Sequence, residues 1–77
     1  MKEVVEVLVC ALVDYPDEVE VIEESRKGDT VYLNVMVAPG DMGKVIGRHG
    51  RIANAIRAVA NAAGAKQNAR AVIDFNS

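Results

Sequence analysis

Apolar residues recur with the period of a helix near the start of the chain. In residues 2–14 they fall at positions i, i+3, i+4 and i+7, and this row comprises Val5, Leu8, Val9 and Leu12. Such spacing is typical of an amphipathic helix, although the many valines also favour a strand. The length of the run favours the helix. Tyr15-Pro16 ends it, because the residue before a proline avoids the helical region.

A two-residue alternation follows and predicts two strands, at residues 19–25 and 30–38. In the second, Val31, Leu33, Val35 and Val37 alternate with Tyr32, Asn34 and Met36, which is the pattern of a strand with one buried face. Residues 26–29 contain Gly28 and predict a hairpin turn between the strands. Pro39-Gly40 ends the second strand.

The helical period returns in the second half of the chain. Asp41 is a candidate N-cap for a short helix at residues 42–46, and a turn at 47–50 separates it from a longer helix at 51–63. The expected core side of that helix is Ile52, Ala55, Ile56, Val59 and Ala63, and the expected solvent side is Asn54, Arg57 and Asn61. Its many alanines favour the helical state. Gly64 is the expected C-terminal stop, and residues 69–75 form a last strand.

Charge is divided unevenly between the two halves of the chain. The 77 residues are enough for one domain, residues 1–77. The net charge of the chain is −2, which by itself argues against a nucleic-acid partner. However, residues 1–42 hold ten acidic and three basic side chains, whereas residues 43–77 hold six basic and one acidic. Four of the six bases lie between Lys44 and Arg57. This asymmetry points to a negatively charged partner, with a merely solvated surface as the alternative.

Several other classes of function are not supported by the composition. Cys10 is the only cysteine, so the chain forms no internal disulfide and has no cysteine-based metal set. No apolar run approaches the length of a membrane span, and no signal peptide is evident, so we expect a cytoplasmic protein. Neither Cys10 nor His49 has a catalytic partner recognisable in the sequence. We therefore expect no enzyme activity, no cofactor and no metal.

The basic residues cluster around a Gly-x-x-Gly step, Gly47-Arg48-His49-Gly50. Two glycines allow a tight turn and a close approach to a ligand, and a cationic loop that opens a helix suits a phosphate backbone. The spacing does not match a P-loop or a dinucleotide fingerprint. A DNA-binding helix-turn-helix fits only loosely, because the second helix is alanine-rich and strands flank the pair. An RNA-binding sheet surface would need more aromatic residues than Tyr32.

The residues around this step resemble the I-G-x-x-G signature of KH domains, in the run Gly43-Lys44-Val45-Ile46-Gly47-Arg48-His49-Gly50-Arg51-Ile52. Over residues 1–76 the chain is similar to the small bacterial single-KH proteins of the KhpA or YlqC-like family. The resemblance implies an α+β fold of type II order, α-β-β-α-α-β, with a three-stranded sheet and helices packed on one face. It also implies binding of single-stranded RNA, a role as an RNA chaperone or post-transcriptional regulator, and a homodimer or a heterodimer with a second KH-type protein.

By the same resemblance, the loop clamps the backbone of about four nucleotides. Gly47 and Gly50 would allow the close approach, and Arg48 and His49 would contact phosphates. The expected flanking contacts are Lys44, Ile46, Arg51, Ala53, Asn54 and Arg57, with residues 35–37 bordering a groove for the bases. The alternatives are that Ile46 belongs to the core and that Asn54 and Arg57 are simply solvated. A KH-fold protein-interaction module without RNA binding is the rival function.

Overall fold

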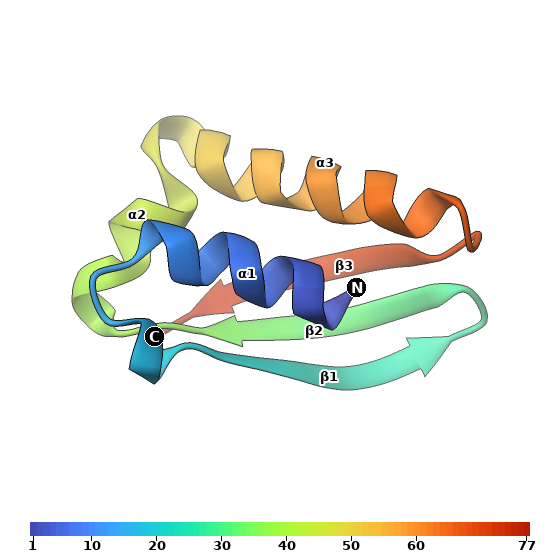
Figure 1. Ribbon diagram of the computed structural model, residues 1–77, viewed down its shortest axis with the longest axis horizontal. Coiled ribbons are helices and arrows are strands. Elements are labelled where there is room, and N and C mark those ends of the chain that lie inside the picture. The colour runs from blue at the N-terminus through green and yellow to red at the C-terminus, as the bar shows by residue number, and fades with distance from the viewer.

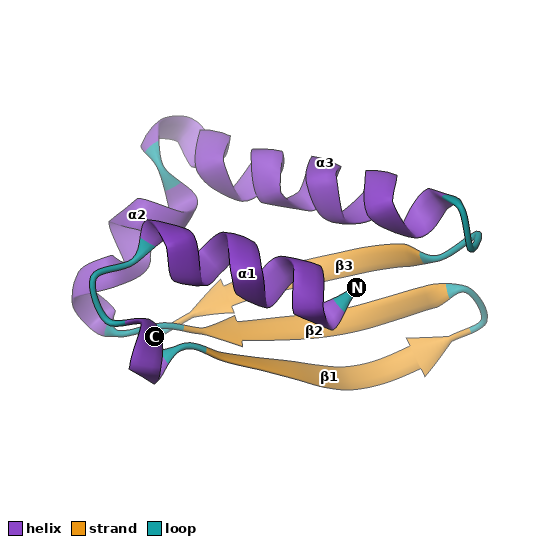
Figure 2. Ribbon diagram, in the orientation of Figure 1, coloured by secondary structure: helices purple, strands orange, loops and turns teal.

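The computed structural model describes all residues, Met1–Ser77, as a three-stranded sheet with helices on one face (Figures 1 and 2). Strand β1 (Glu20–Lys27) pairs antiparallel with β2 (Thr30–Met36), and β2 pairs parallel with β3 (Arg70–Asn76). The strand order is β1-β2-β3. A parallel neighbour requires a crossover, and α2 (Met42–Ile46) with α3 (Arg51–Ala65) supplies it between β2 and β3.

The helix α1 (Lys2–Leu12) lies over the sheet beside α3, and together they cover the apolar core. The alternation predicted for β2 is confirmed: its odd-numbered residues face the helices, and Val35 is fully buried. Val5 and Val9 of α1, Val45 of α2 and Ile56 of α3 join them in one cluster. The sequence therefore predicted the fold class, the element order and the inward face of β2 correctly. No helix has the length and apolarity needed to cross a bilayer.

The inward face of α3 differs from the predicted one. The buried positions are Ala53, Ile56, Ala60 and Gly64, whereas Ala55 and Ala63 are exposed and Val59 is 47% exposed. Apolar side chains surround most of this helix, so the period alone fits more than one face. The structure turns the small residues toward the sheet, where they allow a close approach, and leaves Val59 outside.

The prediction that Gly64 ends α3 is wrong. Gly64 lies buried within the last turn of the helix. A Cβ atom there would overlap the Met1 side chain and would lie 2.7 Å from the carbonyl oxygen of Ala69. The helix ends at Ala65, and in the turn that follows Asn68 has a left-handed φ of 53°. Gly64 is thus a packing glycine, and asparagine supplies the left-handed residue instead.

Asp41 does not cap α2 through its side chain, contrary to the prediction. Its carboxylate is 1% exposed and accepts the backbone N–H groups of Asp14 (3.1 Å) and Tyr15 (3.0 Å). The bonds cross 27 and 26 positions of sequence, which no local pattern could reveal. Asp41 therefore fixes the segment that follows α1 against the start of α2.

Candidate nucleic-acid interface

The loop between α2 and α3 has a backbone that depends on its glycines. Gly47 has φ 73° and ψ 175°, a region that is essentially restricted to glycine. A Cβ atom at Gly47 would lie 2.7 Å from Ile52 Cγ1. Gly50 is left-handed, with φ 74° and ψ 16°, and directly precedes α3. The two glycines thus bring the loop backbone close to the first turn of α3 and expose its tip.

The tip of the loop carries Arg48 and His49, and both side chains are exposed. His49 has φ 58° and ψ 25°, an uncommon left-handed conformation for a residue other than glycine. Neither side chain takes part in a hydrogen bond or ion pair of the protein. Backbone strain of this kind clusters at ligand-binding sites. The tip therefore offers positive or protonatable groups that the fold itself does not use.

Of the two basic residues beside the loop, one forms an ion pair within the protein and the other does not. Arg51, at the start of α3, is exposed. Lys44 of α2 is also exposed, but its Nζ lies 3.1 Å from Asp14 Oδ2. The hydrogen bond and the negative charge of Asp14 raise the pKa of Lys44 above its ordinary value. Lys44 is thus fully charged near neutral pH and already has an acidic partner.

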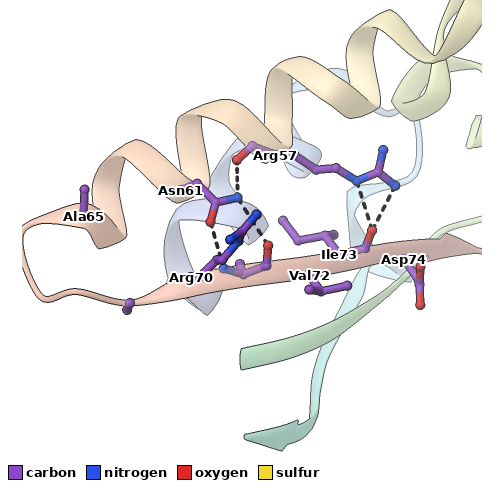
Figure 3. Close-up of a pocket in the computed structure, with 9 residues that line it drawn as sticks. Arg57, Asn61, Ala65, Arg70, Val72, Ile73 and Asp74 are labelled. Carbon is purple, nitrogen blue, oxygen red and sulfur yellow. Dashed lines mark hydrogen bonds between the residues drawn. The ribbon is translucent and has the colours of Figure 1, made fainter. Parts of the chain in front are cut away.

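A groove runs between α3 and β3, and we name it the α3–β3 groove after the residues that line it, chiefly Arg57, Asn61, Arg70, Ile73 and Asp74. Arg57 donates from Nε (3.1 Å) and Nη2 (2.9 Å) to the carbonyl oxygen of Ile73, as Figure 3 shows. Asn61 accepts the N–H of Ala71 at 2.9 Å and donates to its carbonyl oxygen at 3.2 Å. Arg57 and Asn61 therefore form hydrogen bonds with the backbone N–H and carbonyl groups along the free edge of β3.

Polar side chains continue from the groove toward the loop, by way of a hydrogen bond between Arg57 and Asn54. Arg57 Nη1 donates to Asn54 Oδ1 at 3.1 Å, and Asn54 is exposed one turn into α3. The Arg57 guanidinium also lies over the Phe75 ring, 5.4 Å from its centroid. Asn54, Arg57 and Asn61 therefore form a polar row from the loop along the groove. The predicted solvent side is confirmed for Asn54, which is exposed, but is wrong for Arg57 and Asn61, which are half-buried against β3.

The predicted site residues only partly come together. The loop and its two flanks contain Lys44, Gly47, Arg48, His49, Gly50 and Arg51. Asn54 lies one turn into α3, and Arg57, which bonds to it, lines the groove. Ile46 is half-buried and packs on the core. Ala53 is 2% exposed, so its side chain is a core contact and does not border a groove, which corrects the expectation for that residue.

The prediction that residues 35–37 border the groove is likewise corrected. Val35 and Val37 are buried beneath the helices, and β2 is the central strand of the sheet. The α3–β3 groove borders β3 and not β2. Its residues Asn61 and Arg70 were not among the predicted contacts. Asn61 follows Arg57 by one helical turn, a spacing that places both on one face and could have indicated it.

The model of the family described as KhpA/KhpB, KH domain, matches residues 2–75 of the chain. A protein of Clostridium acetobutylicum named RNA-binding protein KhpA is 50% identical, over 97% of this chain and 99% of its own length. A protein of the same name from Halalkalibacterium halodurans is 47% identical, over 97% of this chain and 97% of its own length. Another from Aquifex aeolicus is 43% identical, over 97% of this chain and 94% of its own length.

No solved structure matches the chain significantly. The matching family is one of KH domains and not of enzymes, which confirms the prediction that this chain is not an enzyme. The family match covers all the helices and nearly all the sheet described above, including the Gly47–Gly50 loop. The chain therefore belongs to the KhpA/KhpB family of KH domains.

Proposed function

We propose that this protein binds single-stranded RNA, with the phosphate backbone held at the Gly47–Gly50 loop and the bases directed along the α3–β3 groove. The observation that carries the proposal is the exposed pair Arg48 and His49, set on a glycine-dependent turn and unused by the fold. The relatives named RNA-binding protein KhpA support it. We expect the protein to meet its single-stranded RNA in the cytoplasm.

A role as an RNA chaperone or post-transcriptional regulator follows from this mode of binding. The loop contacts phosphates, which carry no sequence information directly, and the groove offers few aromatic residues on which bases could stack. The sequence preference should therefore be weak, so that many transcripts can be held briefly. No metal or cofactor takes part in this proposal.

Titration of labelled RNA with the protein tests the function. We expect fluorescence anisotropy to detect binding of a single strand of about ten nucleotides at low salt. The logarithm of the association constant should fall with the logarithm of the salt concentration, with a slope of about −0.7 for each phosphate contacted. A blunt duplex of the same sequence should bind more weakly, because its bases cannot enter the groove. Absence of binding at low salt, or a preference for the duplex, would contradict the proposal.

Failure of that test would favour the second candidate, a KH-fold interaction module that does not bind RNA. A surface suited to binding another protein is present, and it is compatible with either candidate. An apolar furrow lies between α1 and α3, which we name the α1–α3 furrow, lined by Leu8, Ala11, Leu12, Ile52, Ala55 and Val59, with Arg51 as its only charged residue. Leu12 is 41% exposed and Val59 is 47% exposed. Burial of this surface would favour association.

We propose that a second copy of the chain covers the α1–α3 furrow in the RNA-binding protein. Val59 lines the furrow and is exposed, so a two-fold axis can pack the furrow of one copy against the same furrow of the other. Arg51 lies at the end of α3 nearest the loop, so the centre of the contact is free of charge. Two clamps on one RNA would raise the effective concentration of the second.

Val59→Asp should dissociate this dimer, because it places a charge at the centre of an apolar contact. Sedimentation equilibrium should give about twice the 8.3 kDa chain mass for the parent protein and the single chain mass for the variant. Ile22→Asp, on the exposed face of the sheet, is the matched control and should remain dimeric. A monomeric parent protein would contradict the second copy and leave a different KH-type protein as the partner. If only Ile22→Asp dissociated the dimer, the dimer interface would lie on the exposed face of the sheet and not in the furrow.

A further inference from the structure

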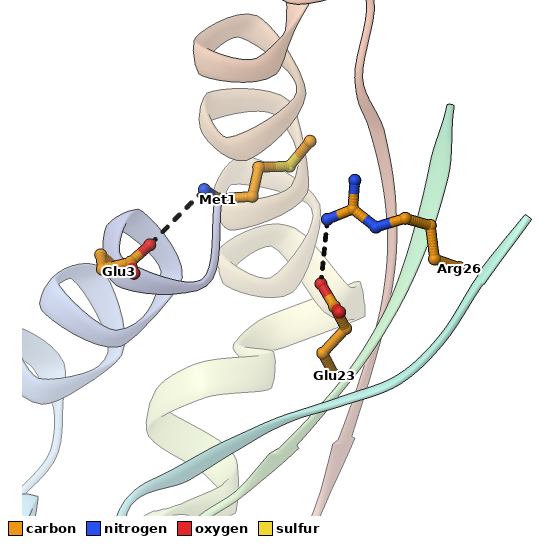
Figure 4. A network of polar contacts seen from close by, with 4 residues as sticks. All are labelled: Met1, Glu3, Glu23 and Arg26. Carbon is orange, nitrogen blue, oxygen red and sulfur yellow. Dashed lines mark hydrogen bonds and ion pairs between the residues drawn. The ribbon is translucent and has the colours of Figure 1, made fainter. Parts of the chain in front are cut away.

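Lys44 is the only basic residue near the loop that forms an ion pair. The two other ion pairs of the protein join the Met1 amino group to Glu3 and Arg26 to Glu23 (Figure 4), on α1 and β1. Arg48, His49 and Arg51 have no acidic partner within the chain. An RNA phosphate that approaches the loop from the side of Lys44 would therefore meet an ammonium group already bonded to the Asp14 carboxylate.

The position of Asp14 is fixed more firmly than that of an ordinary surface residue. Its side chain is 67% exposed, but its backbone N–H is held by the buried carboxylate of Asp41, which also holds Tyr15. The segment after α1 cannot move away without breaking both bonds. Because the Asp41 carboxylate is buried, it holds the backbone of Asp14 at a place from which the exposed Asp14 carboxylate reaches Lys44.

We propose that Asp14 limits the RNA affinity of the loop, by competing with phosphate for Lys44 and by repelling the strand on that side. This proposal rests on the proposed function. Asp14 is thus a residue that sets affinity without contacting RNA. It leaves Arg48, His49 and Arg51 as the effective phosphate contacts and keeps binding weak enough for exchange between transcripts.

Asp14→Asn tests this proposal, since asparagine keeps the size of the side chain and the backbone N–H that Asp41 accepts. The expected result is an affinity for single-stranded RNA about three- to tenfold higher at about 50 mM salt, with a salt slope more negative by about 0.7 because Lys44 becomes an additional phosphate contact. Glu24→Gln is the control. It removes the same charge from an exposed position on β1 that takes part in no ion pair.

A double-variant comparison separates the local effect from the change in net charge. In a Lys44→Gln background, Asp14→Asn should lose most of its gain in affinity, whereas a general charge effect would persist. An unchanged or lower affinity for Asp14→Asn would overturn the proposal. So would a gain no larger than that of Glu24→Gln, or an equal gain without Lys44. The parent titration keeps the two proposals distinct, since RNA binding by the parent with no gain for Asp14→Asn refutes only the role of Asp14.

Discussion

Reversal of the charge at the tip of the loop should abolish RNA binding while leaving the fold intact. For the double variant Arg48→Asp, His49→Asp we expect a loss of affinity of at least about 100-fold, because two groups that face phosphate become repulsive. The fold should tolerate the change, since both side chains are exposed and neither forms a hydrogen bond or ion pair within the protein. Aspartate also tolerates the left-handed backbone found at His49.

The matched control for this variant is Lys27→Asp with Gln67→Glu, which gives the same change in net charge when His49 is neutral. These residues lie near the hairpin and the α3–β3 turn, at the end of the molecule opposite the loop (Figure 1). Anisotropy measures the affinity, and circular dichroism with thermal melting verifies the fold. Equal losses for the two double variants would mean that net charge, and not the loop, governs binding.

Removal of the buried carboxylate at Asp41 should produce the largest loss of stability. Asp41→Ala leaves the N–H groups of Asp14 and Tyr15 without their acceptor, and we expect the free energy of unfolding to fall by about 2–4 kcal/mol. That is a large share of the stability of a domain this small. Asp41→Asn keeps one acceptor oxygen and should show a smaller loss.

Urea denaturation measures this effect, with the exposed Asp17→Ala as the control. The loss for Asp41→Ala should appear in the denaturation midpoint with an unchanged slope. A midpoint equal to that of the control would contradict the structural role assigned to Asp41. The variant should also lose the Lys44–Asp14 pair, because the segment after α1 is no longer fixed.

The parts of the fold that the sequence predicted are those governed by short periods. The alternation in β2 defines its buried face, and Pro16 and Pro39 mark the ends of α1 and β2 closely. The Gly47–Gly50 step was identified because a glycine-bracketed basic pair is a local signal. Its positive φ values agree with the expected need for glycine.

The features that the sequence did not predict depend on contacts between distant segments. Asp41 satisfies the general pattern of an N-cap, yet its partners lie in the segment after α1. In α3, alanine is compatible with either face, so only the packing of the helix against the rest of the fold selects Ala53 and Ala60 for burial. The same packing turns Arg57 and Asn61 toward the edge of β3. Position in the fold, not residue type, makes them part of the groove.

The most direct test of the central claim is a map of the RNA contacts at residue level. Isotope-labelled protein would be titrated with a single-stranded RNA of about eight nucleotides, twice the length that a KH loop clamps, and amide chemical shifts would be followed by NMR. We predict the largest changes at residues 47–51, continuing along α3 and β3 at Asn54, Arg57 and Ile73. Changes confined to the α1–α3 furrow or to the exposed face of the sheet, or no change at low salt, would contradict RNA binding by the loop.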